Sequence, residues 1–245
     1  MRAVRAPAPR LGPGPRTLPR DTSHYLCRVL RMDRGDRFVA FDPDTHVEAD
    51  AVIDEPSADA ARVTIGPLRR PAVVADSPLV LVQALAKGDK VDAVVRDATE
   101  LGATRIVVAR TSRSVTKLGE GLVPSRLERW RRIAEQAARQ CGRADPPSID
   151  GVHDWPRALD AAGEADARFC LDARAVEPLG ARLPAVAASG ASIAFAVGPE
   201  GGLDDDEVGA AQDRGFSPVS IGRFVLRTET MAAAVLGTVR VLRGS

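Results

Sequence analysis

The hydrophobic positions follow two different rhythms along the chain. In residues 21–70 they fall in short segments, and residues 47–53 alternate between apolar and polar as a half-buried strand does. Two further strands are predicted at 37–42 and at 63–65. Short strands placed so close together predict a small β-barrel.

In the rest of the chain, continuous apolar runs alternate with amphipathic segments. The apolar runs predict buried strands at residues 79–85, 105–109, 169–171, 193–197 and 219–221. The amphipathic segments predict helices, of which the clearest begin at Asp89, Pro124 and Thr228. Strands that are apolar on both faces and alternate with helices indicate an α/β domain with a parallel sheet. We therefore place a β-barrel domain at residues 1–70 and an α/β domain at 75–245, joined by a proline-containing linker.

Composition narrows the class of protein. The chain has 245 residues, of which 44% are hydrophobic and 27% charged, so it contains enough apolar material for packed cores. No apolar run is long enough to span a membrane, and we expect neither a signal peptide nor a membrane partner. The three cysteines and three histidines are widely spaced, so no disulfide framework and no metal site are expected. These features fit a protein of the reducing cytoplasm.

Arginine is unevenly distributed, although the formal net charge is only +1. Residues 1–20 contain five Arg, five Pro and no acid, which predicts an extended basic arm. The predicted helix at 124–143 carries six Arg against two Glu, and Arg132, Arg139 and Arg143 share one of its faces. Each segment is either solvated surface or part of an electrostatic footprint for nucleic acid.

A glycine-rich loop at Gly198–Gly202 follows an apolar run and precedes a predicted helix that begins with acids. In an open parallel sheet, ligands bind beyond the carboxyl ends of the strands, and glycine lets the backbone approach a ligand closely. The loop lacks the dinucleotide and triphosphate motifs, and the acids at 204–207 would repel a phosphate. It therefore indicates a ligand without phosphates, unless it is a plain turn whose acids stabilise the helix dipole.

A second cluster of polar residues, 221–230, joins the last predicted strand to the last helix. Thr228 can cap this helix, and Glu229 lies in its first turn. Arg227 at the end of a strand is either a functional cation or the partner of Glu229 or of an acid in the 204–207 run.

Several motifs occur in an order that resembles one family. They are Lys87-Gly88-Asp89-Lys90, Ala98-Thr99-Glu100-Leu101-Gly102, Arg113-Ser114-Val115, Gln140-Cys141-Gly142-Arg143, Gly198-Pro199-Glu200-Gly201-Gly202-Leu203 and Val225-Leu226-Arg227-Thr228-Glu229-Thr230. Taken together, the set resembles the RsmE-type methyltransferases of the SPOUT superfamily. Phe224 departs from the family pattern, which usually has an arginine at this position.

The resemblance implies a fold and a reaction that composition does not show. The fold would be α/β, with a small N-terminal PUA-like β-barrel and a C-terminal SPOUT α/β domain that ends in a deep trefoil knot. S-adenosylmethionine would bind in the knot, and the active site would form across a homodimer. The enzyme would methylate N3 of a uridine of 16S ribosomal RNA (uridine 1498 in the family) in the small ribosomal subunit.

The resemblance also assigns residues to roles. By motif position, Arg227 would stabilise the uracil anion, and Glu229 is a candidate base, with water as the other candidate. The cofactor would be bound by Leu171, Val197, Gly198, Pro199, Glu200, Gly201, Gly202, Ile221, Gly222, Val225 and Leu226. RNA would be bound by Arg2, Arg5, Arg10, Arg28, Arg31, Arg113, Arg132, Arg139 and Arg143.

Two other functions stay open at this point. One is a non-catalytic RNA-binding ribosome-assembly factor with a decayed cofactor site, and the other is a SPOUT methyltransferase that acts on a different RNA. For the homodimer we expect an interface on the last helix, along the apolar stripe formed by Met231, Ala232, Val235, Leu236 and Val239.

Overall fold

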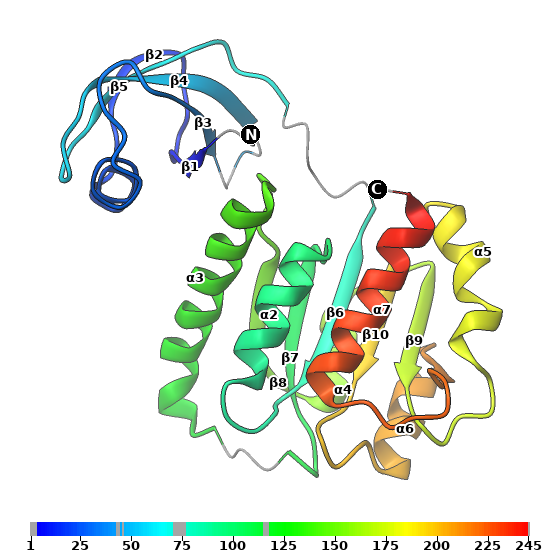
Figure 1. Ribbon diagram of the computed structural model, residues 1–245. Coiled ribbons are helices and arrows are strands. Elements are labelled where there is room, and N and C mark those ends of the chain that lie inside the picture. The colour runs from blue at the N-terminus through cyan, green and yellow to red at the C-terminus, as the bar shows by residue number, and fades with distance from the viewer. Residues whose placement is uncertain (1–3, 43–44, 46, 71–76, 115–117, 245) are drawn as a thin grey trace. The chain divides into compact units, whose positions relative to one another are not determined.

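The computed structural model describes residues 4–42, 45, 47–70, 77–114 and 118–244, which form two compact units (Figure 1). The N-terminal unit comprises Met1–Val74 together with Ala138–Pro146, and the C-terminal unit comprises Ala75–Ala137 and Pro147–Ser245. Arg2, Val115 and most of the predicted linker lie outside the described residues. Each unit is described here by itself.

The N-terminal unit is built on a sheet of five strands in the order β1-β3-β4-β5-β2. β1 runs parallel to β3, and the other neighbours are antiparallel. A short helix, α1 (Arg20–Ser23), leads into the π-helical turn η1 (His24–Val29), whose Leu26 is buried against the sheet with Phe38 and Ile53. The strands are β1 (Arg5–Pro7), β2 (Gly14–Thr17), β3 (Arg37–Asp42), β4 (Val47–Glu55) and β5 (Arg62–Ile65).

The segment before α1 is extended rather than helical, as predicted, but its described part belongs to the sheet and does not form a separate arm. Strands β1 and β2 both lie in this segment, at the two edges of the sheet. The guanidinium of Arg5 donates a hydrogen bond to Glu48 at 2.6 Å and lies 5.6 Å from the centroid of the Phe41 ring. The charge of Arg5 therefore holds the sheet together instead of facing a phosphate.

The C-terminal unit contains six strands, all parallel, in the order β11-β9-β10-β6-β7-β8. The chain therefore starts at the middle of the sheet, builds outward to β8, and then fills the other half. β6 and β10 are neighbours at the point where this order reverses, which is where open α/β sheets bind ligands. The strands are β6 (Leu79–Ala84), β7 (Arg105–Arg110), β8 (Ser148–Asp154), β9 (Ala167–Leu171), β10 (Ile193–Val197) and β11 (Ser217–Val219).

Helices cover both faces of this sheet (Figure 1). α2, α3, α5 and α7 pack on the face that carries Leu81 and Phe195, whereas α4 and α6 pack on the face that carries Val82 and Ala196. Alternate residues of each strand thus serve two separate cores, as the pleat requires. The helices are α2 (Lys90–Glu100), α3 (Val123–Cys141), α4 (Trp155–Ala161), α5 (Leu183–Ala188), α6 (Asp205–Gln212) and α7 (Thr228–Arg243), with 3-10 turns η2 (Glu120–Leu122) and η3 (Leu179–Ala181).

The apolar stripe of α7 is covered by its own unit. Ala232, Val235, Leu236 and Val239 are each at most 1% exposed, and they belong to the core that α7 shares with α2, α5 and the sheet. The prediction that this stripe forms a dimer interface is therefore wrong. Among the described residues, no helix has the length and the apolar character needed to cross a membrane.

Candidate active site at the carboxyl ends of the central strands

The glycine-rich loop leaves β10 at the centre of the sheet, where the strand order reverses. A Cβ atom on Gly198 would lie 2.9 Å from the side chain of Leu203, so only glycine fits there. Gly202 has a φ of +70°, which also favours glycine. Both glycines are thus required by the turn itself, which brings bare backbone to the end of the sheet.

A buried hydroxyl ties three chain segments together beside this loop. Thr228, at the start of α7, donates a hydrogen bond to the carbonyl of Gly198 at 2.7 Å. The same hydroxyl accepts one from Nε2 of Gln83, at the end of β6, at 2.8 Å. Sequence reasoning missed Gln83, although a polar residue within an apolar strand was the available signal. The contact fixes the carbonyl of Gly198 and the first turn of α7 relative to each other.

A small pocket of about 80 Å³ opens next to these bonds. Eight of the predicted cofactor-binding residues line it: Leu171, Val197, Gly198, Pro199, Glu200, Gly202, Val225 and Leu226. Ala173, Thr228 and Met231 complete the lining that the structure describes. Its walls are largely apolar side chains, and the glycines add exposed backbone polar groups, a combination typical of small-molecule sites.

Gly201 does not line this pocket, and its close neighbour is a protein side chain. A Cβ on Gly201 would lie 3.2 Å from Cβ of Arg113, whose guanidinium donates to the carbonyl of Gly201 at 3.0 Å. Arg113 was predicted to contact RNA. In the structure this exposed side chain supports the glycine-rich loop, and its contact with RNA stays a prediction.

Ile221 and Gly222 do not line the small pocket either. They line a second pocket of about 410 Å³, together with residues of η3, α5 and α7 such as Leu183 and Leu242. Their role in cofactor binding therefore stays a prediction. Their neighbours mark a different apolar hollow on the C-terminal unit.

Charged side chains gather at one side of the small pocket. Nζ of Lys90 lies 2.8 Å from the carboxylate of Glu200 and 3.7 Å from that of Glu229. Burial raises the pKa of Glu200, but the hydrogen bond from Lys90 and two from backbone N–H groups outweigh it and lower the pKa. The bond to Glu200 likewise raises the pKa of Lys90. Both groups are therefore charged at neutral pH.

Arg227 lies at the same side, immediately before the first turn of α7. Its guanidinium is exposed and forms no hydrogen bond or ion pair within the described part of the chain, although its charge acts to lower the pKa of Lys90. The alternative in which Arg227 pairs with Glu229 or with the 204–207 acids is therefore not observed. Oε2 of Glu229 is buried and accepts no hydrogen bond from the described residues. Among the described residues, the Arg227 cation without an ion pair and the Glu229 oxygen without a hydrogen bond thus lie on the same side of the small pocket, with Lys90 at 3.7 Å from that oxygen.

The acids at 204–207 have structural partners. Asp204 and Glu207 form a reciprocal capping box at the start of α6, and Asp205 pairs with Arg174 at 2.6 Å. Glu207 also accepts from the backbone of Ser112 at 2.6 Å. Helix capping therefore accounts for this run, and within the described residues no cluster of His, Cys, Asp and Glu could hold a metal ion.

The predicted RNA-binding arginines differ in their surroundings. Arg143 is 4% exposed and pairs with Asp145, so its assignment to an RNA-binding stripe is wrong. Arg139 lies 5.2 Å from the centroid of the Tyr25 ring, within the N-terminal unit. The remaining arginines, exposed at the surface of their units, are Arg10, Arg28, Arg31 and Arg132.

Comparison with known proteins identifies the two units. An RNA methyltransferase PUA domain matches residues 18–66, and an RNA methyltransferase domain matches residues 75–240. The ribosomal RNA small subunit methyltransferase E of Mycobacterium tuberculosis is 34% identical over 91% of this chain and 84% of its own, and that of Bacillus subtilis is 28% identical over 90% and 89%. A crystal structure of this enzyme from Neisseria gonorrhoeae, bound to S-adenosyl methionine, superposes with a TM-score of 0.86 at 26% identity over 98% of both chains.

These matches confirm the resemblance that the motifs suggested. The N-terminal unit is PUA-like, and the C-terminal unit is a SPOUT-like α/β domain with a parallel sheet. The chain belongs to the ribosomal RNA small subunit methyltransferase E family.

Proposed function

We propose that the protein methylates N3 of a uridine in 16S ribosomal RNA, with S-adenosylmethionine as the methyl donor. The observation that carries this proposal is the pocket at the carboxyl ends of β9 and β10, formed by the glycine-rich loop and the start of α7. It stands where the family implies the cofactor, and a solved relative in the same family holds that cofactor. A ribosomal substrate also agrees with the cytoplasmic location expected from the sequence.

The residues present fit S-adenosylmethionine. Leu171, Val225 and Leu226 supply apolar walls for an adenine ring, and the backbone at Gly198 and Gly202 supplies hydrogen-bonding groups for its edge. Glu200 in the lining is paired with Lys90 at 2.8 Å, so the pair adds no net positive charge, which suits a cofactor without phosphates. When bound, the cofactor supplies an electrophilic methyl group.

The chain's own residues would prepare the uracil for this methyl group. N3 of uracil carries a proton at neutral pH, and that proton must leave as the bond from N3 to the methyl carbon forms. Oε2 of Glu229 can accept it, because this oxygen is buried and accepts no hydrogen bond from the described residues. Arg227 can stabilise the negative charge that spreads onto the uracil carbonyls, a contribution of roughly 3 kcal/mol for one preorganised donor.

The connection between β11 and α7 supports the trefoil knot that we propose for this domain. β11 is the edge strand, yet Thr228 is bonded at the centre of the sheet. On the way, Ser220 bonds the backbone of Glu177 and Leu179 in the segment between β9 and α5. The last segment therefore crosses beside an earlier connection before the final helix begins. We also keep residues 1–70 as the RNA-binding domain and 75–245 as the methyltransferase domain.

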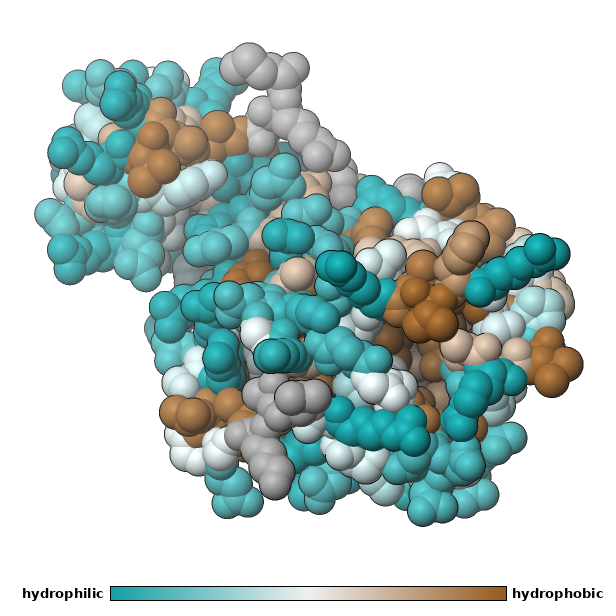
Figure 2. Space-filling model, turned by 60° about the horizontal axis from the view of Figure 1, so that its bottom comes forward, coloured by the Kyte–Doolittle hydropathy of each residue, from teal (hydrophilic) through white to brown (hydrophobic). Residues whose placement is uncertain are grey.

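We further propose a homodimer, with an interface different from the predicted stripe. Large apolar side chains remain exposed on the C-terminal unit, and apolar residues gather there into a patch (Figure 2). Val176, Phe224, Val225 and Val241 are between 80% and 98% exposed, and all except Val225 lie within two positions in the chain of residues that line the pocket of about 410 Å³. Because Val225 also lines the small pocket, a second copy seated here would complete the active site.

The interface can be tested by a charge at its edge. Val241→Glu should convert the dimer into a monomer of 25.9 kDa by light scattering. Val241 lies near the end of α7, far along the helix from Thr228, so the variant should stay folded. A wild-type protein that is monomeric at micromolar concentration would contradict this interface.

The activity is tested by mapping methylated nucleotides in 16S ribosomal RNA. RNA from a strain that lacks the protein should lose one N3-methyluridine, and the wild-type protein should restore it whereas Arg227→Ala should not. A protein that binds RNA without binding S-adenosylmethionine in calorimetry would favour the assembly-factor alternative. Methylation restored at another RNA would favour the alternative target.

A further inference from the structure

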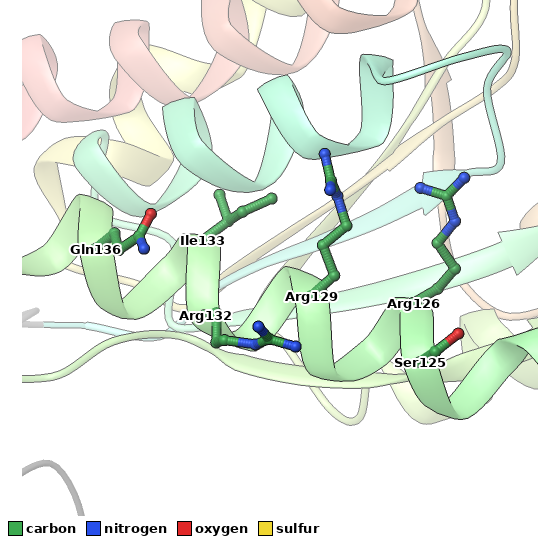
Figure 3. A pocket seen from close by; sticks show the side chains of 6 residues that line it. All are labelled: Ser125, Arg126, Arg129, Arg132, Ile133 and Gln136. Atoms are coloured by element: carbon green, nitrogen blue, oxygen red, sulfur yellow. The ribbon is translucent and has the colours of Figure 1, made fainter. Parts of the chain in front are cut away.

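A groove of about 690 Å³ runs along α3 in the C-terminal unit (Figure 3). All of its described lining comes from a little more than three turns of this one helix. Three guanidinium groups, two neutral polar side chains and one apolar residue line it, and no carboxylate does. The lining residues are Ser125, Arg126, Arg129, Arg132, Ile133 and Gln136.

One of the three arginines is held in place from the neighbouring helix. Nε of Arg129 donates to Asp92 of α2 at 2.7 Å, and the same carboxylate accepts from the indole of Trp130 at 2.9 Å. A buried tryptophan thus fixes the acid that orients Arg129. A guanidinium has five N–H donors, so Arg129 keeps donors for a ligand after this bond is made.

The other two arginines are available. Arg126 forms no ion pair within the described part of the chain and projects to the same side of α3 as Arg129 (Figure 3). Arg132 pairs only with Glu128, one turn earlier on the same helix, at 3.2 Å. The side chains of Arg132 and Glu128 are each about two-thirds exposed. An exposed ion pair of this kind contributes little to stability, so a phosphate can replace the glutamate.

The spacing of the arginines favours an extended polyanion. Arg132 lies six positions after Arg126, which corresponds to about 9 Å along a helix that rises about 1.5 Å per residue. Arg129 lies between them, so positive charge is distributed along the groove instead of converging on one point. Arginine forks match phosphate oxygens bidentately, and Ser125 and Gln136 add neutral donors at the two ends.

We propose that the groove along α3 binds consecutive backbone phosphates of the RNA substrate. The inference rests on the proposed function for the identity of the RNA, and on the groove itself for the place. Arg126 and Arg129 join Arg132 in this role, whereas Arg139 on the last turn of α3 and Arg143 after the helix do not. The groove would position the RNA strand, while the sequence of the target is read elsewhere.

The test compares single charges on the same helix. Arg126→Gln and Arg132→Gln remove a lining charge, whereas the matched control Arg131→Gln removes an exposed charge that does not line the groove. The affinity of each variant for a 16S ribosomal RNA transcript is measured over a range of salt concentrations. Each lining substitution should reduce the salt slope by about 0.7, and so weaken binding about fivefold more at 0.1 M than at 1 M salt. The control should keep the wild-type slope.

The outcomes separate the groove from the activity. Equal losses in Arg131→Gln and in the lining variants would show that only net charge matters, and unchanged binding in all three would show that the groove is unused; either result overturns the proposal. If the wild-type protein binds the transcript through the groove but never methylates it, the proposed function fails and the groove stands. Normal methylation by lining variants that also bind normally leaves the function intact and removes the groove.

Discussion

Removing the hydroxyl of Thr228 tests directly how the site is held together. This one hydroxyl donates a hydrogen bond to the carbonyl of Gly198 and accepts one from the side-chain amide of Gln83. Thr228→Val removes the hydroxyl and keeps a β-branched side chain of similar shape. The substitution therefore cuts the connection between β6, β10 and α7 without opening a large cavity.

The cost follows from the groups that lose a partner. The carbonyl of Gly198 loses a buried donor, and Nε2 of Gln83 keeps only the carbonyl of Ala84, at 3.0 Å. A buried polar group left without its partner costs about 1–3 kcal/mol. We expect a loss of about 2 kcal/mol in the free energy of unfolding, because Gln83 retains one bond. In a chain of this size that corresponds to a decrease of about 4–8 °C in Tm.

The measurement is urea unfolding followed by tryptophan fluorescence. Trp130 and Trp155 are the two tryptophans of the chain, both are at most 3% exposed, and both lie in the C-terminal unit with Thr228. The matched control is Thr238→Val on the same helix, where the exposed hydroxyl bonds only its own helix, at the carbonyl of Ala234. The control should change stability by less than about 0.5 kcal/mol. Equal losses in the two variants would refute the bridging role of Thr228.

Three further predictions concern single side chains. Arg227→Ala should lower the single-turnover methylation rate at saturating RNA by about a hundredfold, with RNA affinity unchanged. Burial raises the pKa of Asp150, but hydrogen bonds, chiefly from Arg105, outweigh it and lower the pKa from 3.8 to about 2. This stabilisation is present above pH 3.8 and is lost as the pH falls toward 2. After allowance for solvent screening, Asp150→Asn should lower the free energy of unfolding by about 1 kcal/mol at pH 7 and by nothing at pH 2. Acid-unfolding curves measure this difference. Burial raises the pKa of the Cys170 thiol to about 12, so thiol reagents should label Cys170 only after unfolding, as peptide mass mapping will show.

Continuous apolar runs predicted best the strands that are buried on both faces. The apolar runs of β6, β7 and β10 were found because alternate residues of these strands pack into the two cores on either side of the sheet. β8 was missed because it is the edge of the sheet, where Asp150 and His153 can reach water. β1 and β2 were missed because Pro7 and Pro15 argue against strands, although proline is tolerated on edge strands such as these.

For the site, the positions of the motifs predicted the pocket better than the expectation that each glycine approaches a ligand. The glycine-rich loop and the residues of 225–228 do meet at one pocket, since both follow strands at the same end of the sheet. Gly201, however, is close to Arg113 and not to the pocket. That contact joins loops from distant parts of the chain, and no local pattern in the sequence encodes it.

Helix α7 shows why periodicity alone could not place the dimer interface that we propose. An apolar stripe indicates that one face of a helix is covered. The stripe looks the same in the sequence whether that face packs on the helix's own sheet or on a second copy of the chain. Once the sheet is seen to cover Val235 and Leu236, the apolar residues that remain exposed become the informative ones. Phe224 and Val241 belong to no periodic stripe, and large apolar side chains left in water next to an apolar hollow indicate a partner.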